Sequence, residues 1–167
     1  AKPDNDPLDI IFKFTYETKF NQVKTLTDGR WNVTTFTYDY ELPTTDPRYG
    51  TKGNLVKIDQ PKDNKGNTPT TFFRYNLSGQ VTEVDDPNRI LIQLAYFPLL
   101  STVGTWGNLK DITQDPGGIN AITQLNYDLY GNVNSVTDAE NHRTQISYDI
   151  LNRIKQITNP LNYFMRY

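Results

Sequence analysis

The stretch YNLSGQVTEVDDPNRILIQLAY, residues 75–96, begins and ends on a tyrosine and contains two strand-like segments separated by turn residues. Its two tyrosines are 21 residues apart. The same interval separates Tyr127 from Tyr148, and 22 residues separate Tyr16 from Tyr38. A recurring interval of this size indicates a repeat architecture, in which every unit contributes the same few elements.

Each unit begins with a short strand that ends on the repeat tyrosine. The residue two positions before the tyrosine is apolar, and the residue between them is polar or small, as in Phe73-Arg74-Tyr75. This alternation is typical of a strand with one buried face. The apolar residues are Phe14, Phe36, Phe73, Leu94, Leu125 and Ile146, and the tyrosines are Tyr16, Tyr38, Tyr75, Tyr96, Tyr127 and Tyr148.

A tight turn and a second strand follow the tyrosine. The turn needs a residue that accepts a positive φ. The second strands are VKTL, LVKI, VTEV, LKDI, VNSV and IKQI, which begin at residues 23, 55, 81, 109, 133 and 154. Their apolar residues are three positions apart and would face opposite sides of a flat strand, so either both faces are covered or a β-bulge intervenes. We expect the positive φ at Gly53, Gly79, Gly107 and Gly131, and at the asparagines Asn21 and Asn152.

Insertions lengthen two of the intervals between tyrosines, to 37 and 31 residues. They follow either the tyrosine or the second strand and consist mostly of turn residues, so we interpret them as loop expansions of one frame. The insertions are ELPTTDPRYGTK (41–52), KDNKGNTP (62–69), LLSTVGTW (99–106) and DPGGIN (115–120).

The composition favours β structure and a thin core. The 167 residues have a net charge of -2, a mean hydropathy of -0.66 and 36% hydrophobic residues, with 11 tyrosines and 8 phenylalanines. No cysteine is present, which excludes disulfides and thiolate chemistry. Scattered single cations argue against a nucleic-acid partner. We find no apolar run long enough to span a membrane and no signal peptide in AKPDNDPLDI (1–10).

About six units of two strands predict an all-β fold of repeated antiparallel β-hairpins. Open twisted sheets of more than about 10 strands tend to curl, so we expect a curled, spiralling sheet that forms a single domain over residues 1–167. Tyr167 lies two positions before the next expected tyrosine. We therefore expect the chain to be a fragment of a larger protein.

The repeat resembles the YD repeat of the Rhs family, in which Tyr-Asp is followed by a turn glycine and then by Asn or Arg and an apolar residue. The segments that carry the resemblance are YDLYGNVNSVTDAENHRTQISYD (127–149), YDILNRIKQITNP (148–160) and FNQVKTLTDGRWNVTTFTYD (20–39). The match covers about residues 12–167. It departs from the family pattern at residues 16, 75 and 96, where Glu, Asn and Phe follow the tyrosine.

The resemblance implies both a fold and a function. Bacterial polymorphic toxins, toxin-complex components, wall-associated proteins and teneurins contain such repeats, which wind a β-sheet into a hollow shell. On this basis we expect a structural shell segment that encapsulates a toxin or effector in a secreted or surface-displayed bacterial protein. Its partners would be the remainder of the same polypeptide or the enclosed effector. The alternative is a carbohydrate-binding module of a cell-surface YD-repeat protein.

The repeated polar residues are better explained by turns than by catalysis. Asp39, Asp128 and Asp149 follow the repeat tyrosine, where a side-chain cap is expected. The adjacent pair Asp85 and Asp86 falls at the second turn of its unit, and His142 is the only histidine. We therefore expect no catalytic site, no metal site and no cofactor.

Three aromatic residues lie outside the repeated core positions, in turns or insertions: Trp31, Tyr49 and Trp106. An exposed ring of this size is suited to contact with a neighbouring part of a larger protein or to stacking against a sugar. Packing over the end of the sheet would also account for them. We take the three as candidate ligand or contact residues.

Overall fold

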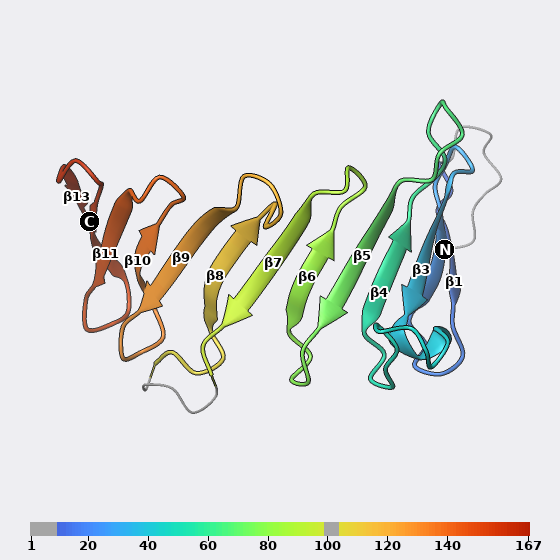
Figure 1. Cartoon of the computed structure of the whole chain (residues 1–167), viewed down its shortest axis with the longest axis horizontal. Coiled ribbons are helices and arrows are strands. Elements are labelled where there is room, and N and C mark those ends of the chain that lie inside the picture. The colour runs from blue at the N-terminus through green and yellow to red at the C-terminus, as the bar shows by residue number, and fades with distance from the viewer. Residues whose placement is uncertain (1–9, 99–103) are drawn as a thin grey trace. The chain divides into compact units, whose positions relative to one another are not determined.

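The computed structural model describes residues 10–98 and 104–167 and is all-β, as the repeat predicts. Its strands are antiparallel neighbours in chain order (Figure 1). The insertion at 41–52 is preceded by a 3-10 turn, η1 (Asp39–Glu41), and residues 99–103 of the insertion at 99–106 lie outside the described residues. The strands are β1 (Lys13–Tyr16), β2 (Val23–Thr27), β3 (Val33–Tyr38), β4 (Leu55–Asp59), β5 (Thr70–Tyr75), β6 (Val81–Asp85), β7 (Leu91–Tyr96), β8 (Leu109–Gln114), β9 (Ala121–Tyr127), β10 (Val133–Thr137), β11 (Arg143–Tyr148), β12 (Ile154–Thr158) and β13 (Phe164–Arg166).

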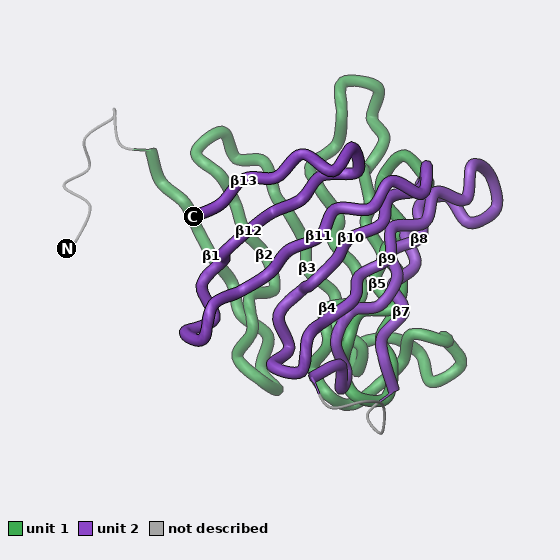
Figure 2. The backbone as a smooth tube through the Cα atoms, turned by 90° about the vertical axis from the view of Figure 1, so that its left-hand side faces the viewer, with its two compact units in different colours: residues 1–89 green, residues 90–167 purple. Residues whose placement is uncertain are grey.

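The strands fall into two compact units, residues 1–89 and 90–167 (Figure 2). The first unit contains β1 to β6, and the second contains β7 to β13. In each unit, the turns that follow the repeat tyrosines lie along one rim, and the turns that follow the second strands lie along the opposite rim (Figure 1). The two rims can therefore carry different chemistry.

A β-bulge in every second strand explains the three-residue spacing of its apolar side chains. In the β5–β6 hairpin, Tyr75 pairs with Val81 and Arg74 pairs with Glu83, so Thr82 is the extra residue. Phe73 pairs with Val84, and the bulge thus places both valines on the face of Phe73 and Tyr75. Of the two explanations open at the sequence level, the bulge is correct. The other shifts lie between Thr15/Tyr16, Thr37/Tyr38, Ala95/Tyr96, Val133/Ser135 and Ser147/Tyr148.

The opposite face of each hairpin is polar. The residue before the tyrosine faces this side and pairs with a polar residue across the hairpin. Thr15 and Thr25 approach to 2.6 Å between their hydroxyl oxygens, and the Arg74 Nε lies 2.8 Å from Glu83 Oε2. One face is therefore apolar and the other polar, as in an antiparallel sheet with one wet side.

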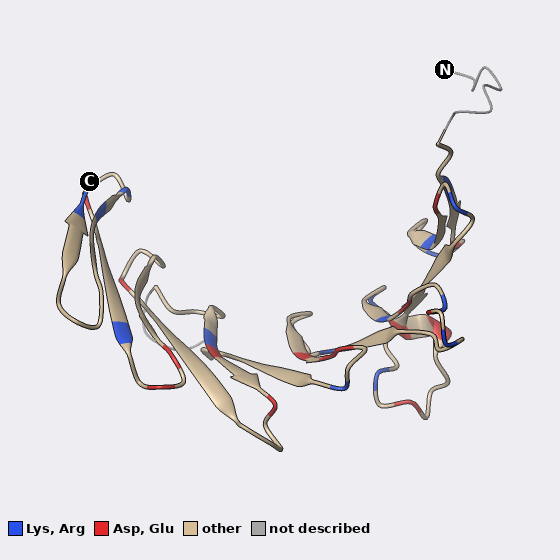
Figure 3. Cartoon of the chain, turned by 90° about the horizontal axis from the view of Figure 1, so that it is seen from above, with Lys and Arg blue, Asp and Glu red and all other residues tan. Residues whose placement is uncertain are grey.

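The core is thin because the described residues of each unit form a single layer of strands. Tyr38 and Val56 are the apolar residues that are fully buried among those described. The chain exposes 11999 Å² of surface, whereas a compact monomer of 19.2 kDa exposes about 8,400 Å². Lys and Arg are interspersed with Asp and Glu along strands and turns (Figure 3). A sheet this open leaves much of its apolar face available to other parts of an assembly.

Candidate functional site

The repeat tyrosines join each hairpin to the one before it. In four units the buried or half-buried tyrosine hydroxyl donates a hydrogen bond to the main-chain carbonyl of the first residue in the preceding bulged strand. We call this set of contacts the tyrosine ladder. It comprises Tyr38 to Val23 (2.6 Å), Tyr75 to Leu55 (2.7 Å), Tyr127 to Leu109 (2.7 Å) and Tyr148 to Val133 (2.9 Å).

Strand pairing explains why these carbonyls need a hydroxyl partner. The β2–β3 ladder runs from Thr27 only as far as Thr25, opposite Thr35, and Val23 lies beyond its end. The carbonyl of Val23 therefore has no strand partner on that side, and the Tyr38 hydroxyl supplies one. Each ladder contact thus closes the gap that opens between neighbouring hairpins where the bulge begins.

Burial raises the pKa of three ladder tyrosines, Tyr38, Tyr75 and Tyr127. Desolvation raises the pKa of Tyr38, and the nearby carboxylates of Glu17 and Glu41 raise it further. Desolvation also raises the pKa of Tyr75, with a contribution from Asp39, and that of Tyr127. A neutral hydroxyl can donate to a carbonyl, whereas an ionised one cannot, so these shifts favour the ladder.

Where an aspartate follows the repeat tyrosine, its side chain caps the turn. Asp128 Oδ1 accepts the amides of Tyr130 (2.9 Å) and Asn132 (3.0 Å). Burial acts to raise the pKa of Asp128, but the side-chain and backbone hydrogen bonds from Asn132 outweigh it and lower the pKa. Asp149 caps the amides of residues 151 and 153, and Asp39 those of residues 52 and 53. The cap interpretation is confirmed.

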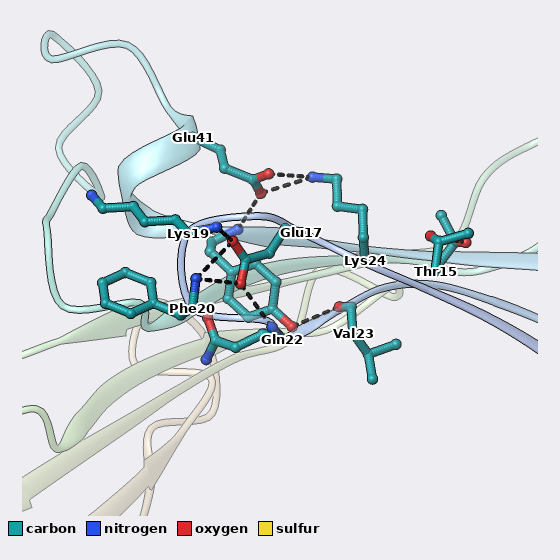
Figure 4. A network of polar contacts seen from close by, with 10 residues as sticks. Thr15, Glu17, Lys19, Phe20, Gln22, Val23, Lys24 and Glu41 are labelled. Carbon is teal, nitrogen blue, oxygen red and sulfur yellow. Dashed lines mark hydrogen bonds and ion pairs between the residues drawn. The ribbon is translucent and has the colours of Figure 1, made fainter.

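In the first repeat, which begins with β1 and β2, a glutamate takes the place of the capping aspartate (Figure 4). Glu17 is buried and accepts the amides of Lys19 (2.6 Å), Phe20 (2.9 Å) and Gln22 (2.7 Å). Burial alone would raise its pKa, but these hydrogen bonds, led by that of Gln22, lower the pKa to about 2. Because Glu is one methylene longer than Asp, it reaches the same amides across a wider turn.

A second carboxylate anchors the neighbouring strand in the same network. Glu41 accepts both the ammonium of Lys24 (2.7 Å) and the main-chain amide of Tyr38 (2.9 Å). Tyr38 is therefore held at its amide by Glu41 and at its hydroxyl by Val23. The network is structural, because the carboxylates of Glu17 and Glu41 are already hydrogen-bonded to main-chain amides and Lys24.

Of the acidic pair and the histidine considered from the sequence, Asp85 ends strand β6, and Asp86 and His142 lie in turns. Asp86 Oδ1 accepts the amide of Asn88 at 2.8 Å, and Asp85 is 3.4 Å from Arg89. His142 Nδ1 is 3.4 Å from Asp138 Oδ2 at the exposed turn between β10 and β11. Across residues 10–98 and 104–167, no group of three or more His, Asp or Glu side chains is arranged to hold a metal ion.

The turn glycines adopt the left-handed backbone expected for them. Gly79 and Gly131 have φ of +81° and +85°, and Gly53 and Gly107 have +79° and +66°. Asn152, at the equivalent position of a later unit, has +59°. A Cβ on Gly53 would lie 3.1 Å from the Phe20 ring, whereas one on Gly79 would meet open space. Backbone conformation is therefore the constraint common to these positions, and packing adds to it only at some.

The three candidate contact aromatics do not form one site. Trp31 lies in the β2–β3 turn with the ammonium of Lys13 4.4 Å from its ring centre, and Tyr49 lies in the β3–β4 loop at the other end of β3. Trp106 belongs to the second unit and is exposed. Their roles must be considered separately.

Tyr49 lines a cavity of about 400 Å³ in the first unit. Arg74 and Glu83, paired at 2.8 Å, form part of its wall. Arg48, also in the wall, bonds to Asp46 at 2.7 Å through its guanidinium. The cavity therefore offers an aromatic ring beside the paired charges of Arg74 and Glu83. Lys52, whose ammonium bonds to the carbonyl of Leu77, also lies in its wall. An aromatic ring next to polar side chains suits a polar ligand.

Several exposed apolar residues in the turns were not predicted from the sequence to be candidate contact residues. Leu77, Leu129 and Ile150 each lie two positions after a repeat tyrosine and are among the most exposed apolar side chains of the chain. Their signal was present as a recurring apolar residue inside a turn, where polar residues are expected.

Comparisons with known proteins show the fold. No protein-family model and no curated protein matches the chain. The crystal structures of TcdB2-TccC3 and of TcdB2-TccC3-Cdc42 each cover 90% of it with a TM-score of 0.69 and 16% sequence identity. The chain has the fold of an Rhs/YD-repeat shell. It spans 7% of the length of those toxin-complex chains. In the parts of the chain that the structure describes, no helix is both long and apolar enough to span a membrane.

Proposed function

We propose that this chain is a non-enzymatic structural segment of an Rhs/YD-repeat shell that encapsulates a toxin or effector in a secreted or surface-displayed bacterial protein. The contact between successive hairpins supports this proposal. Every bulged strand has the same register, and the tyrosine ladder connects successive hairpins through main-chain carbonyls. A joint that depends on backbone atoms can be repeated along a wall with changing side chains.

The open surface also supports a wall. A single layer of strands exposes more surface than a compact domain of this mass, so its stability in a longer protein would draw on neighbouring segments. The toxin-complex chains that share the fold are many times longer than this chain. We infer that the partners are the remainder of the same polypeptide or its encapsulated effector.

The absence of catalysis belongs to the same proposal. Asp39, Asp128 and Asp149 cap turns, and Glu17 is held by three main-chain amides. Groups engaged in this way are poor candidates for proton transfer or nucleophilic attack. The chain's contribution would be enclosure.

Protease protection in the full-length protein tests the proposal. The intact protein is digested in parallel with a form carrying Tyr127→Phe and Tyr148→Phe, which weakens two ladder contacts, and cleavage of the segment beyond the repeats is followed by mass spectrometry. We expect that segment to be protected in the intact protein and cleaved faster in the variant. Equal cleavage in the intact protein and in the isolated segment would contradict enclosure.

A carbohydrate-binding module is the second candidate, and the position of Tyr49 at the 400 Å³ cavity favours it. Sugar rings stack on exposed aromatic faces while polar side chains bind their hydroxyls. Under this alternative, Tyr49→Ala would abolish binding on a glycan array and leave the melting temperature nearly unchanged. Background binding by the unmodified chain would remove this candidate.

A further inference from the structure

One rim of the second unit carries a row of exposed apolar side chains at the tips of its turns. Trp106 follows β7, Leu129 and Tyr130 join β9 to β10, and Ile150 and Leu151 join β11 to β12. Their exposed fractions are 58%, 67%, 81%, 99% and 66%. We call these five residues the apolar rim.

Direct contacts place the three turns side by side. A Cβ on Gly104 would lie 2.8 Å from the Cα of Leu129, so the loop that contains Trp106 touches the β9–β10 turn. The side-chain amide of Asn132 donates to Asn152 Oδ1 at 3.1 Å, which connects that turn to the β11–β12 turn. The three turns that carry the apolar rim therefore lie next to one another along one edge of the unit, the edge at which the turns after β7, β9 and β11 lie in Figure 1.

The turn backbones are largely satisfied without water. In the β9–β10 turn, the amides of Tyr130, Gly131 and Asn132 all bind Asp128. Asp149 binds the equivalent three amides of the β11–β12 turn. These turns can be buried in an interface without leaving an N–H group that lacks a hydrogen-bond partner, which favours a contact without trapped water.

The size of the rim fits an interface between two proteins. With about 200 Å² for each aromatic side chain and about 120 Å² for each leucine or isoleucine, the five expose roughly 550 Å². Two such rims in contact would bury roughly 1,100 Å², which exceeds the area of about 1,000 Å² expected of a specific protein interface. At the base of the rim, Arg153 lies 2.7 Å from Asp149, and the Asp128 carboxylate accepts the main-chain and side-chain amides of Asn132.

We propose that the apolar rim is an interface for a second copy of this chain, with the two rims related by a two-fold axis. Hairpin tips repeat at about 10 Å, twice the spacing of strands, so a two-fold arrangement can bring the row of tips of one copy against the row of tips of the other. A two-fold contact uses the same five residues twice, and none of the five carries a charge that would oppose it. This inference stands on the second unit alone and does not rest on the proposed shell.

Sedimentation velocity over a concentration series from about 1 to 100 µM tests the interface. The unmodified chain is compared with the pair Leu129→Ser and Ile150→Ser. The matched control is Ile119→Ser with Leu161→Ser, which removes equally exposed apolar residues from the opposite rim of the same unit. Circular dichroism checks that all forms keep the β fold.

We expect the unmodified chain and the control double variant to dimerise with the same Kd. The Kd of the double variant Leu129→Ser and Ile150→Ser should be at least about tenfold higher. A second rim pair, Tyr130→Ser with Leu151→Ser, should show the same weakening. A monomer at the highest concentration, or equal weakening by the control pair, would overturn the proposal. So would a monomeric chain that floats with phosphatidylcholine vesicles only when the rim is intact, because the occupant would then be a lipid surface.

Discussion

Replacement of Tyr38 by phenylalanine isolates one contact of the tyrosine ladder. The change removes a single hydroxyl from a side chain that is 6% exposed and leaves its ring in place. The carbonyl of Val23 loses the partner that lies 2.6 Å away. Since the β2–β3 ladder has already ended at Thr25, no strand amide takes over that role.

The expected cost follows from the burial of the contact. A net hydrogen bond contributes about 1 kcal/mol, and a buried carbonyl left without a partner costs about 1–3 kcal/mol. We therefore expect Tyr38→Phe to lower the free energy of unfolding by about 1–3 kcal/mol. For a chain of this length that corresponds to a fall of roughly 2–10 °C in melting temperature.

Urea denaturation provides the measurement, followed by the fluorescence of Trp31 in the first unit and Trp106 in the second and by circular dichroism of the strands. The matched control is Tyr16→Phe, the same change at the equivalent position of edge strand β1. Among the described residues, the Tyr16 hydroxyl has no hydrogen-bond partner and its side chain is exposed. We expect the control to change stability by less than about 0.5 kcal/mol. Equal losses in the two variants would refute the role given to the ladder.

Three further changes test other parts of the structure. Acidification from about pH 4 to about pH 2 should destabilise the chain. Folding lowers the pKa of Glu17 and of Asp46 to about 2, so these carboxylates stabilise the folded state at pH values above their ordinary pKa, and this stabilisation is lost as the pH falls to about 2. Urea midpoints that stay constant over this pH range would contradict the prediction. Deletion of Asn134, the extra residue of the β10 bulge, should leave Val133 and Val136 on the apolar face as alternate residues of a regular strand, but it removes the gap that the Tyr148 hydroxyl fills at the Val133 carbonyl and should cost about 1 kcal/mol in a thermal melt; an unchanged melt would show that the bulge is dispensable. Gly79→Ala should lose about 1 kcal/mol through its φ of +81° alone, and Gly79→Asn should lose less; a neutral alanine variant would argue against that constraint.

The strands and tight turns were predictable because their signals are local. The alternation at Phe73 and Tyr75 identifies a strand without knowledge of its neighbour, and Gly79 identifies the turn that follows. The same holds for Asp128 and Asp149, whose caps bind amides only two and four residues away. Local hydrogen bonding leaves a mark on the sequence that recurs in each unit.

The bulge and the ladder were harder to predict because each depends on a partner strand. The spacing of Val81 and Val84 allowed two explanations, and the pairing with Tyr75 and Phe73 decides between them. The recurrence of tyrosine was evident, but its acceptor is a main-chain carbonyl, which has no side-chain signature. The neighbour that supplies it lies 15 to 20 residues earlier in the chain.

The surface shared by loop residues was hard to predict for a different reason. Trp31, Tyr49 and Trp106 attract attention because they are large, yet the structure distributes them over different turns. Ile150 drew no attention although it is 99% exposed. Size alone therefore does not reveal which loop residues share a surface, because that depends on which turns lie on the same rim.

A structure of the full-length protein that contains residues 1–167 would test the proposed shell most directly. We predict that β1 and β13 are each hydrogen-bonded to a further strand of the same bulged type, that Tyr16 donates to a carbonyl of the strand before it, and that the continuous sheet surrounds an effector. Free edges at β1 and β13 with no enclosed segment would contradict the proposal that this chain is part of a wall.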